Sequence, residues 1–131
     1  MLANDVTAQD LEAENPLYTA QAKTFSGSCA LGPYMVTADE IRDPHAIEIS
    51  CHIERNGQEI FSGQVSTADL VRKFESLIEY LMRANPVPAA SLLLTGTGIM
   101  VSRSAALAEG DSVTIRGPQL GELTNRAALL N

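Results

Sequence analysis

The sequence predicts a mainly β, α+β fold with one long helix, and three patterns support this prediction. Apolar and polar residues alternate along 47–53, directly ahead of an Asn-Gly pair, which is typical of a β-hairpin. Apolar residues recur every three or four positions between 66 and 84, as they do along one face of an amphipathic helix. Short apolar runs separated by Gly-containing turns occupy 92–128, so we expect further strands there.

The first 33 residues are expected to be irregular apart from one short helix. This helix is predicted over 7–14, and it should stop at Asn15-Pro16 because proline disfavours helical geometry in the residue before it. The stretch 26–33 is rich in small residues. Loops of this composition often let the backbone come close to a ligand.

The clearest structural prediction is a hairpin over 46–65. Its first strand alternates apolar with polar residues, and the apolar members are Ile47, Ile49, Cys51 and Ile53. Asn56-Gly57 then favours a type I′ turn, whose two central residues need positive φ. Ile60 and Val65 fall in the returning strand.

A long helix is predicted from Ser66 to Ala84. Ser66 and Asp69 have the spacing of a capping box at its start, and Asn85-Pro86 ends it. Five apolar residues form one face of this helix: Leu70, Phe74, Leu77, Ile78 and Leu81. Beyond it we expect strands at 92–94, 113–116 and 122–128, a polar glycine loop at 95–98, and turns at 109–111 and 118–121.

Length and composition favour a single domain and exclude several classes of function. A chain of 131 residues can build one domain with a core, but not two. The net charge is −7, with nine basic and 16 acidic residues and no basic cluster, which argues against nucleic-acid binding. No apolar run approaches the roughly 18 residues of a membrane span. The first twenty residues lack the positive start of a secretory signal, so we expect a soluble cytoplasmic protein.

Residue chemistry alone selects two candidate site residues, since the sequence has no HExxH, GxSxG or P-loop motif. Asp5, just before the predicted helix, is either an N-cap or an oxygen ligand for a hard cation such as Mg²⁺. Lys23 is the only Lys in the first half of the chain. It is either a solvated surface residue or the source of a local positive field for a small anionic substrate.

Other reactive residue types receive structural interpretations. His45 and His52 have no Ser or Cys partner in an interpretable motif, so both are expected to be structural. Cys29 and Cys51 lack the CxxC spacing of zinc or redox sites. We expect two reduced thiols, with at least one packed in the core.

Short motifs along almost the whole chain resemble, in order, those of the fumarylacetoacetate hydrolase family. They are Asn4-Asp5-Val6-Thr7-Ala8-Gln9-Asp10, Ala22-Lys23-Thr24-Phe25, Leu31-Gly32-Pro33 with a strand expected after it, Val36-Thr37-Ala38-Asp39-Glu40-Ile41, Asn56-Gly57, Ser66-Thr67, Leu94-Thr95-Gly96-Thr97-Gly98, Glu109-Gly110-Asp111 and Leu123-Thr124-Asn125-Arg126. The segments 14–18, 21–23, 27–33 and 95–99 resemble a bacterial branch that includes 2-keto-3-deoxy sugar acid dehydratase-like members. Hydrolase and decarboxylase members more often read T-G-T-P in the last of these segments.

The resemblance implies a mixed β-roll with one long helix and a divalent-metal-dependent hydrolase or lyase that acts on a small 2-oxo acid. It implies that Asp5 is a metal ligand and that Lys23 is catalytic, stabilising an enolate or moving a proton. Thr97 is implied to bind the substrate carboxylate or a carbonyl. Gln9 takes the substrate-binding position where the family usually has Arg. The implied cofactor is Mg²⁺, which a 2-oxo acid can chelate, and the implied assembly is a homodimer.

One part of the family pattern has no counterpart in this sequence. The family's other metal carboxylates, an Asp and a Glu-x-Glu pair, precede the Asn-Asp motif, which here is Asn4-Asp5. Mg²⁺ prefers six oxygen ligands, so Asp5 alone is not expected to hold it tightly. We therefore expect residues 1–131 to be a single domain that forms the C-terminal part of such a catalytic domain. The alternative is a catalytically silent fragment or a dimerisation module.

Overall fold

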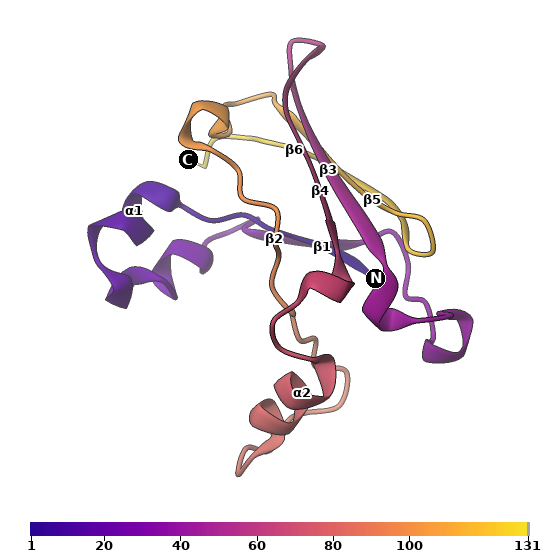
Figure 1. Ribbon diagram of the computed structural model, residues 1–131. Helices are drawn as coiled ribbons and strands as arrows, with labels where there is room; N and C mark the ends of the chain where they lie inside the picture. The colour runs from indigo at the N-terminus through magenta and orange to yellow at the C-terminus, as the bar shows by residue number, and fades with distance from the viewer. Residues whose placement is uncertain (131) are drawn as a thin grey trace.

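The structure, a computed structural model, describes residues 1–130 and is mainly β, as predicted. Four strands form an antiparallel sheet in the order β4-β3-β5-β6, and β1 and β2 form a separate two-stranded sheet (Figure 1). The elements are β1 (Leu2–Asp5), α1 (Gln9–Glu14), β2 (Cys29–Gly32), β3 (Glu48–Arg55), β4 (Gln58–Ser66), α2 (Phe74–Met82), β5 (Ser112–Gly117) and β6 (Gly121–Arg126). Short 3-10 turns connect several of them.

The predicted hairpin is confirmed as the pair β3–β4, in which Glu48 lies opposite Ser66. Its tip is Asn56-Gly57, with φ values of 53° and 77°, so both residues have the positive φ that a type I′ turn requires. The strand expected at 113–116 is confirmed as β5, which pairs with β3. The last strand, β6, ends two residues before the predicted limit of 128.

The core lies against the four-stranded sheet in two adjoining clusters. One contains Cys51, Ile53 and Val113, and the partly buried Ile99 and Val101 pack against it from the loop that precedes β5. The other is built from Leu2, Ile47, Leu120 and Leu123. Burial of these apolar side chains, which is the main favourable contribution to folding, therefore ties β1 and the loop at 99–101 to the sheet.

An ion pair fixes the hairpin to the turn before β5. The Arg55 guanidinium donates to both carboxylate oxygens of Asp111, at 2.9 and 2.7 Å, and the backbone N–H of Ala108 donates to the same carboxylate. Asp111 is 1% exposed. These donors stabilise the charged form, so the pKa of Asp111 falls from 3.8 to about 2. The turn predicted at 109–111 is confirmed, with φ of 88° at Gly110.

The prediction of an irregular segment over 1–33 is wrong at both ends. β1 pairs with β2 in antiparallel register, with Leu2 opposite Gly32 and Asp5 opposite Cys29. Each strand has four residues, too few for an alternating pattern to stand out. The strand expected after Pro33 instead precedes it. Gly32, which ends β2, is buried and lies close to the Leu123 side chain of β6.

The predicted long helix is also wrong in its limits. α2 has nine residues, from Phe74 to Met82, and no helix in the described part exceeds ten residues. Ser66 instead caps a separate 3-10 turn, Thr67–Asp69. The Thr67 hydroxyl accepts from the N–H of Ile47 and donates to the carbonyl of Pro44. These bonds fix the chain direction after β4, and Leu70 leaves the turn in an extended conformation.

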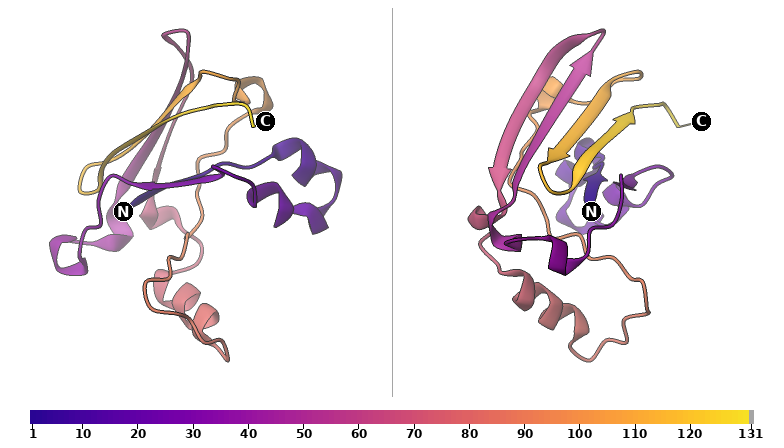
Figure 2. Two further views of the ribbon diagram at one scale, coloured as in Figure 1. Left: turned by 180° about the vertical axis from the view of Figure 1, so that it is seen from behind. Right: turned by 90° about the vertical axis from the view of Figure 1, so that its right-hand side faces the viewer.

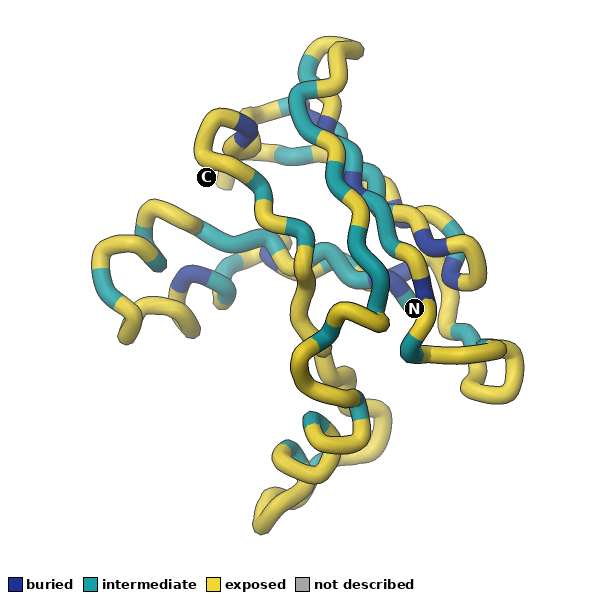
Figure 3. The backbone as a smooth tube through the Cα atoms, viewed as in Figure 1, coloured by how far each residue is buried: buried dark blue, intermediate teal, exposed yellow. Residues whose placement is uncertain are grey.

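The elements project from the sheet in different directions, as the two views of Figure 2 show. α1 lies beyond the ends of β1 and β2, while α2 and the segment after it extend away from the four-stranded sheet. The strand expected at 92–94 is absent, because these residues adopt no regular structure. α2 has no buried residue, and Figure 3 shows most of this region as exposed. No helix in residues 1–130 has the length and apolar character needed to cross a membrane.

Candidate functional site

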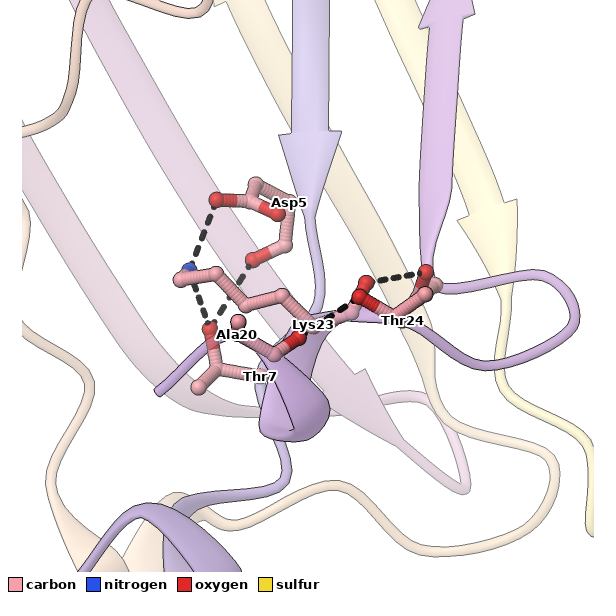
Figure 4. A network of polar contacts seen from close by, with 6 residues as sticks. Asp5, Thr7, Ala20, Lys23 and Thr24 are labelled. Atoms are coloured by element: carbon pink, nitrogen blue, oxygen red, sulfur yellow. Dashed lines mark hydrogen bonds and ion pairs between the residues drawn. The ribbon is translucent and has the colours of Figure 1, made fainter. Parts of the chain in front are cut away.

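A three-residue polar cluster lies where β1 ends and α1 begins (Figure 4). The Lys23 Nζ donates to Oδ2 of Asp5 and to Oγ1 of Thr7, both at 2.7 Å. The Thr7 hydroxyl in turn lies 3.4 Å from the carbonyl oxygen of Asp5. The side chains of Lys23 and Asp5 are 36% and 37% exposed, so the cluster is anchored to the protein but open to a small molecule.

Backbone contacts hold Lys23 in this position. Lys23 ends a short 3-10 helix whose central residue, Ala22, is completely buried. The carbonyl of Ala22 accepts from the N–H of Ala8, and the carbonyl of Lys23 accepts from the Ser28 hydroxyl at 2.8 Å. Ser28 is itself buried. The ammonium therefore projects from a segment fixed on both sides, and reaching Asp5 requires little further ordering.

These contacts bear on the structural interpretation offered above for each candidate residue, and the functional roles of Asp5 and Lys23 stay predictions. Asp5 is not the N-cap of α1: the cap position is Ala8, and α1 has no side-chain cap. Asp5 instead ends β1 and lies directly opposite Cys29 of β2. Lys23 is not an unattached surface lysine, since its ammonium contacts a carboxylate and a hydroxyl.

Within residues 1–130, neither of the other two candidate residues hydrogen-bonds to this cluster. Gln9 opens α1, and its Nε2 lies 3.5 Å from the carbonyl oxygen of Val101, a contact at the long limit of a hydrogen bond. Thr97 lies in the glycine loop, where its Oγ1 accepts from the N–H of Ile99. Within residues 1–130, no hydrogen bond joins Thr97 to Asp5 or Lys23.

Thr97 borders a separate hollow of about 440 Å³. The wall opposite the glycine loop comes from the end of β4 and the chain that follows it, including Val65, Thr67, Leu70 and Leu77. A Cβ on Gly98 would lie 2.7 Å from Val65, so glycine is needed where this loop passes β4. The hollow has the size of a small-molecule site.

The described residues bring no set of carboxylates together that could hold Mg²⁺ by itself. Asp5 is the one carboxylate of the cluster, and no group of three His, Cys, Asp or Glu residues gathers anywhere in residues 1–130. Mg²⁺ prefers six oxygen ligands. A carboxylate that binds through one oxygen, as Asp5 could, supplies only one of them. Two other acids belong to a turn: Glu40 closes a capping box with Thr37, and a hydrogen bond from Thr37 lowers the pKa of Asp39.

The histidines and cysteines have structural surroundings. His45 Nε2 lies 3.1 Å from Glu75, and its ring stacks on Phe74. His52 Nδ1 lies 2.9 Å from Glu59 across the hairpin, and this hydrogen bond lowers the pKa of Glu59. Both cysteines are free, with Cys51 buried and Cys29 exposed. Burial raises the pKa of the Cys51 thiol, as expected for an unreactive core cysteine.

Sequence reasoning assigned no individual role to Thr7, the third member of the cluster. Thr7 stands two residues after Asp5 in the first family-like motif. The sequence offers one signal for such a role: a hydroxyl in the same motif as Asp5 can accept a hydrogen bond, and a lysine ammonium needs acceptors for its three N–H donors. The contact itself depends on the turn between β1 and α1, which the motif alone does not specify.

The family model described as "Fumarylacetoacetate (FAA) hydrolase C-terminal" matches residues 1–128. The 2-dehydro-3-deoxy-D-arabinonate dehydratase of Saccharolobus solfataricus is 45% identical over 122 residues, which cover 93% of this chain and 41% of the relative. A probable 2-keto-3-deoxyxylonate dehydratase of Haloferax volcanii is 40% identical, with 95% of this chain and 43% of the relative covered. The chain thus spans about two fifths of the length of these relatives.

A solved structure has the same fold over nearly the whole chain. It is a 2-keto-3-deoxy-D-arabinonate dehydratase in complex with magnesium and 2,5-dioxopentanoate. The TM-score is 0.92 and the sequence identity 44%, and the match covers 95% of this chain and 44% of that one. Asp5, Thr7 and Lys23 all lie within the residues that the family model matches.

Proposed function

Because this chain belongs to the fumarylacetoacetate hydrolase family, we propose that it is part of a divalent-metal-dependent hydrolase or lyase that acts on a small 2-oxo acid. Dehydration of a 2-keto-3-deoxy sugar acid is the favoured reaction within this class. The names of the two dehydratase relatives support this choice. So does the magnesium and 2,5-dioxopentanoate complex of the similar structure.

The contact between Lys23 and Asp5 is the observation that carries the proposal. An ammonium 2.7 Å from a carboxylate places a fixed positive charge directly beside a candidate metal ligand. Dehydration of a 2-keto-3-deoxy acid removes a proton from the carbon next to the 2-oxo group and expels the hydroxyl of the following carbon. Negative charge develops on the 2-oxo group in the process. In the proposal, Lys23 stabilises that charge or moves the proton.

The other candidate residues receive binding roles in the proposal. Mg²⁺, when bound, supplies Lewis-acid polarisation of a chelated 2-oxo acid. Asp5 would provide one oxygen ligand for it, and the chelated substrate and groups beyond this cluster would provide the others. Thr97, at the edge of its hollow, binds the substrate carboxylate or a carbonyl through its hydroxyl. Gln9 donates an amide N–H where a family Arg would donate from a charged group.

The proposal extends to organisation and location. We assign residues 1–131 to a single domain, the C-terminal part of the catalytic domain, in a homodimer in the cytoplasm. The net charge of −7 and the absence of a membrane-crossing helix in the described residues support an aqueous setting. Sedimentation velocity of the protein measures its oligomeric state directly.

A hybrid protein tests the proposed activity. In this hybrid, the present chain replaces the segment that it matches in the Saccharolobus solfataricus dehydratase. We expect the hybrid to convert 2-dehydro-3-deoxy-D-arabinonate to 2,5-dioxopentanoate in the presence of Mg²⁺. The conversion should stop when EDTA removes the metal. A 2,4-dioxo acid assayed in parallel tests C–C bond hydrolysis. A folded hybrid that binds Mg²⁺ but acts on neither compound would contradict the proposal.

A second candidate function, a catalytically silent structural or dimerisation module, is favoured by one specific observation. The described residues contain no cluster of three metal-ligating side chains, so the isolated chain lacks a complete site. If the hybrid is inactive although folded and loaded with metal, this second function replaces the first.

A further inference from the structure

Two glycines let the loop that carries Thr97 lie directly against β4. A Cβ on Gly98 of the loop would lie 2.7 Å from Cγ2 of Val65 in β4. In the opposite direction, a Cβ on Gly63 of β4 would lie 2.9 Å from Cγ2 of Ile99. Two carbon atoms attract best at about 3.5–4.0 Å, so neither glycine has room for a side chain. Each side of the contact thus supplies one glycine and one β-branched residue.

The two contacts, Gly98 with Val65 and Gly63 with Ile99, are here called the glycine interlock. Gly63 and Val65 are two positions apart in β4, so they share one face of the strand. Gly63 lies opposite Cys51 of β3, and Ile99 packs against the core cluster that contains Cys51. The interlock therefore fixes both how close the loop comes to β4 and where it lies along the strand.

The Thr97 hydroxyl is bonded to the interlocked part of the loop. Its Oγ1 accepts from the N–H of Ile99 at 3.0 Å. A hydroxyl that accepts one hydrogen bond still has its own proton to donate, and a carboxylate or carbonyl oxygen is a suitable acceptor. Because the interlock holds Ile99, it also sets where this donor lies at the edge of the hollow.

The same loop continues toward the other candidate residues. Two positions after Ile99, the carbonyl oxygen of Val101 lies 3.5 Å from Nε2 of Gln9, which opens α1 just beyond Asp5 and Thr7. The loop thus runs from the hollow at Thr97 to the start of this helix. A shift of the loop along β4 would change the separation of the groups to which a binding role has been assigned.

We propose that Gly63 and Gly98 are positioning residues for Thr97. Their missing side chains hold the Thr97 hydroxyl at the depth where it meets the carboxylate or carbonyl of a 2-oxo acid. This inference rests on the proposed function, which gives Thr97 its binding role. Gly63 is not among the residues that line the hollow, so an effect of Gly63 on binding has to pass through the loop.

Binding of 2,5-dioxopentanoate to the hybrid, measured by calorimetry with saturating Mg²⁺, tests this proposal without turnover. Gly98→Ala should weaken the affinity at least about tenfold, because small misplacements of a binding group have effects of this order or larger. In a Val65→Ala background the same substitution should weaken it by less than about threefold. There the clashing Cγ2 is gone, and the Cβ of residue 65 lies at an ordinary contact distance of 3.6 Å.

The matched control is Gly96→Ala in the same loop. Gly96 has a φ of 90°, and a Cβ there would meet no atom within 4 Å, so this substitution strains the backbone without touching β4. Any loss of affinity that it causes should be equal in the parent and Val65→Ala backgrounds. Recovery specific to Gly98 would therefore identify the contact with β4 as the cause.

A Thr97→Val background separates positioning from general damage to the loop. Gly63→Ala, the second test variant, should weaken the affinity of the parent hybrid at least about threefold. With the Thr97 hydroxyl already removed, Gly63→Ala or Gly98→Ala should add less than about twofold, since the group that they displace is absent. A merely structural role would add the same loss in both backgrounds.

Three results would overturn the proposal. The first is a folded Gly98→Ala hybrid with the affinity of the parent. The second is a loss, or a failure to fold in circular dichroism, that Val65→Ala does not relieve. The third is an undiminished loss in the Thr97→Val background. A folded parent hybrid that binds Mg²⁺ but no 2,5-dioxopentanoate would instead overturn the proposed function, and this inference with it, so the two kinds of failure are distinguishable.

Discussion

The Nζ atom of Lys23 lies 2.7 Å from the Oδ2 atom of Asp5, although 18 positions separate the two residues in the sequence. The contact forms because β1 pairs with β2 and the short helix before β2 returns the chain to the end of β1. A candidate metal ligand and a candidate catalytic ammonium thus belong to one local unit. The first two predictions and the last one concern the residues of this unit and its connection to turnover and binding.

Lys23→Met should slow turnover of the hybrid by roughly 10² to 10³-fold, the size of other single electrostatic stabilisers. Metal binding should be largely intact, because the removed ammonium is not a metal ligand. The matched control is Lys73→Met, which changes the only other lysine of the chain, an exposed residue next to α2. Steady-state kinetics with saturating Mg²⁺ measures both variants, and equal rates for the two would remove Lys23 from the catalytic role.

Thr7→Val should lower kcat of the hybrid by roughly tenfold, because the Lys23 ammonium loses one of its two acceptors and hydrogen bonds to charged groups contribute about 1.5–3 kcal/mol. Thr7→Ser keeps the hydroxyl and should restore most of the rate. A defect in kcat with little change in KM would indicate positioning of Lys23. Failure of the Ser variant to recover would point to loss of packing instead.

Asp111 should make the fold sensitive to acid. Its pKa is about 2 in the folded chain against 3.8 for an unperturbed aspartate, so its contribution to stability is complete above pH 3.8 and declines as the pH falls toward 2. Asp111→Asn should flatten the pH dependence of the free energy of unfolding across this window. Urea titrations at several pH values measure it.

The control for this measurement is Glu122→Gln. Arg116 lowers the pKa of Glu122 too, but that pair lies on the surface, where ion pairs contribute little. If Glu122→Gln flattens the profile as much as Asp111→Asn does, the buried pair is not the source of the acid sensitivity.

Gly57→Ala should destabilise the hairpin by about 1–2 kcal/mol, the cost of the left-handed conformation for a residue with a Cβ. The φ of Gly57 is 77°, and a Cβ there would meet no atom within 4 Å, so the effect comes from the backbone alone. The urea midpoint measures the loss, with Gln58→Ala as the neighbouring control. An unchanged midpoint would mean that the turn is not of the I′ type.

Local signals explain why the sheet was predictable and other elements were not. The alternation of apolar and polar residues ahead of Asn56-Gly57 is a pattern between neighbours in the sequence. It predicted the hairpin, and β3 and β4 lie where it was expected. The helix start was mispredicted because Thr67 bonds to Pro44 and Ile47, about twenty positions away. Apolar spacing after Ser66 carries no information about such tertiary contacts.

The candidate site was likewise predictable only in part from the sequence. Residue chemistry left Asp5 and Lys23 undecided between surface and functional interpretations, and the family resemblance alone selected them. Their contact depends on the pairing of β1 with β2, two short strands that the sequence pattern did not reveal. The relation of Thr97 to this pair depends on how the glycine loop crosses β4, which no local pattern specifies.

Calorimetric titration with Mg²⁺ tests the central claim, that Asp5 supplies one ligand of a metal site completed from outside this chain. We expect the hybrid to bind Mg²⁺, the Asp5→Asn hybrid to bind at least about tenfold more weakly because an amide replaces a charged oxygen, and the isolated chain to show no binding at micromolar Mg²⁺. Micromolar binding by the isolated chain, or unchanged affinity of the Asp5→Asn hybrid, would contradict the account.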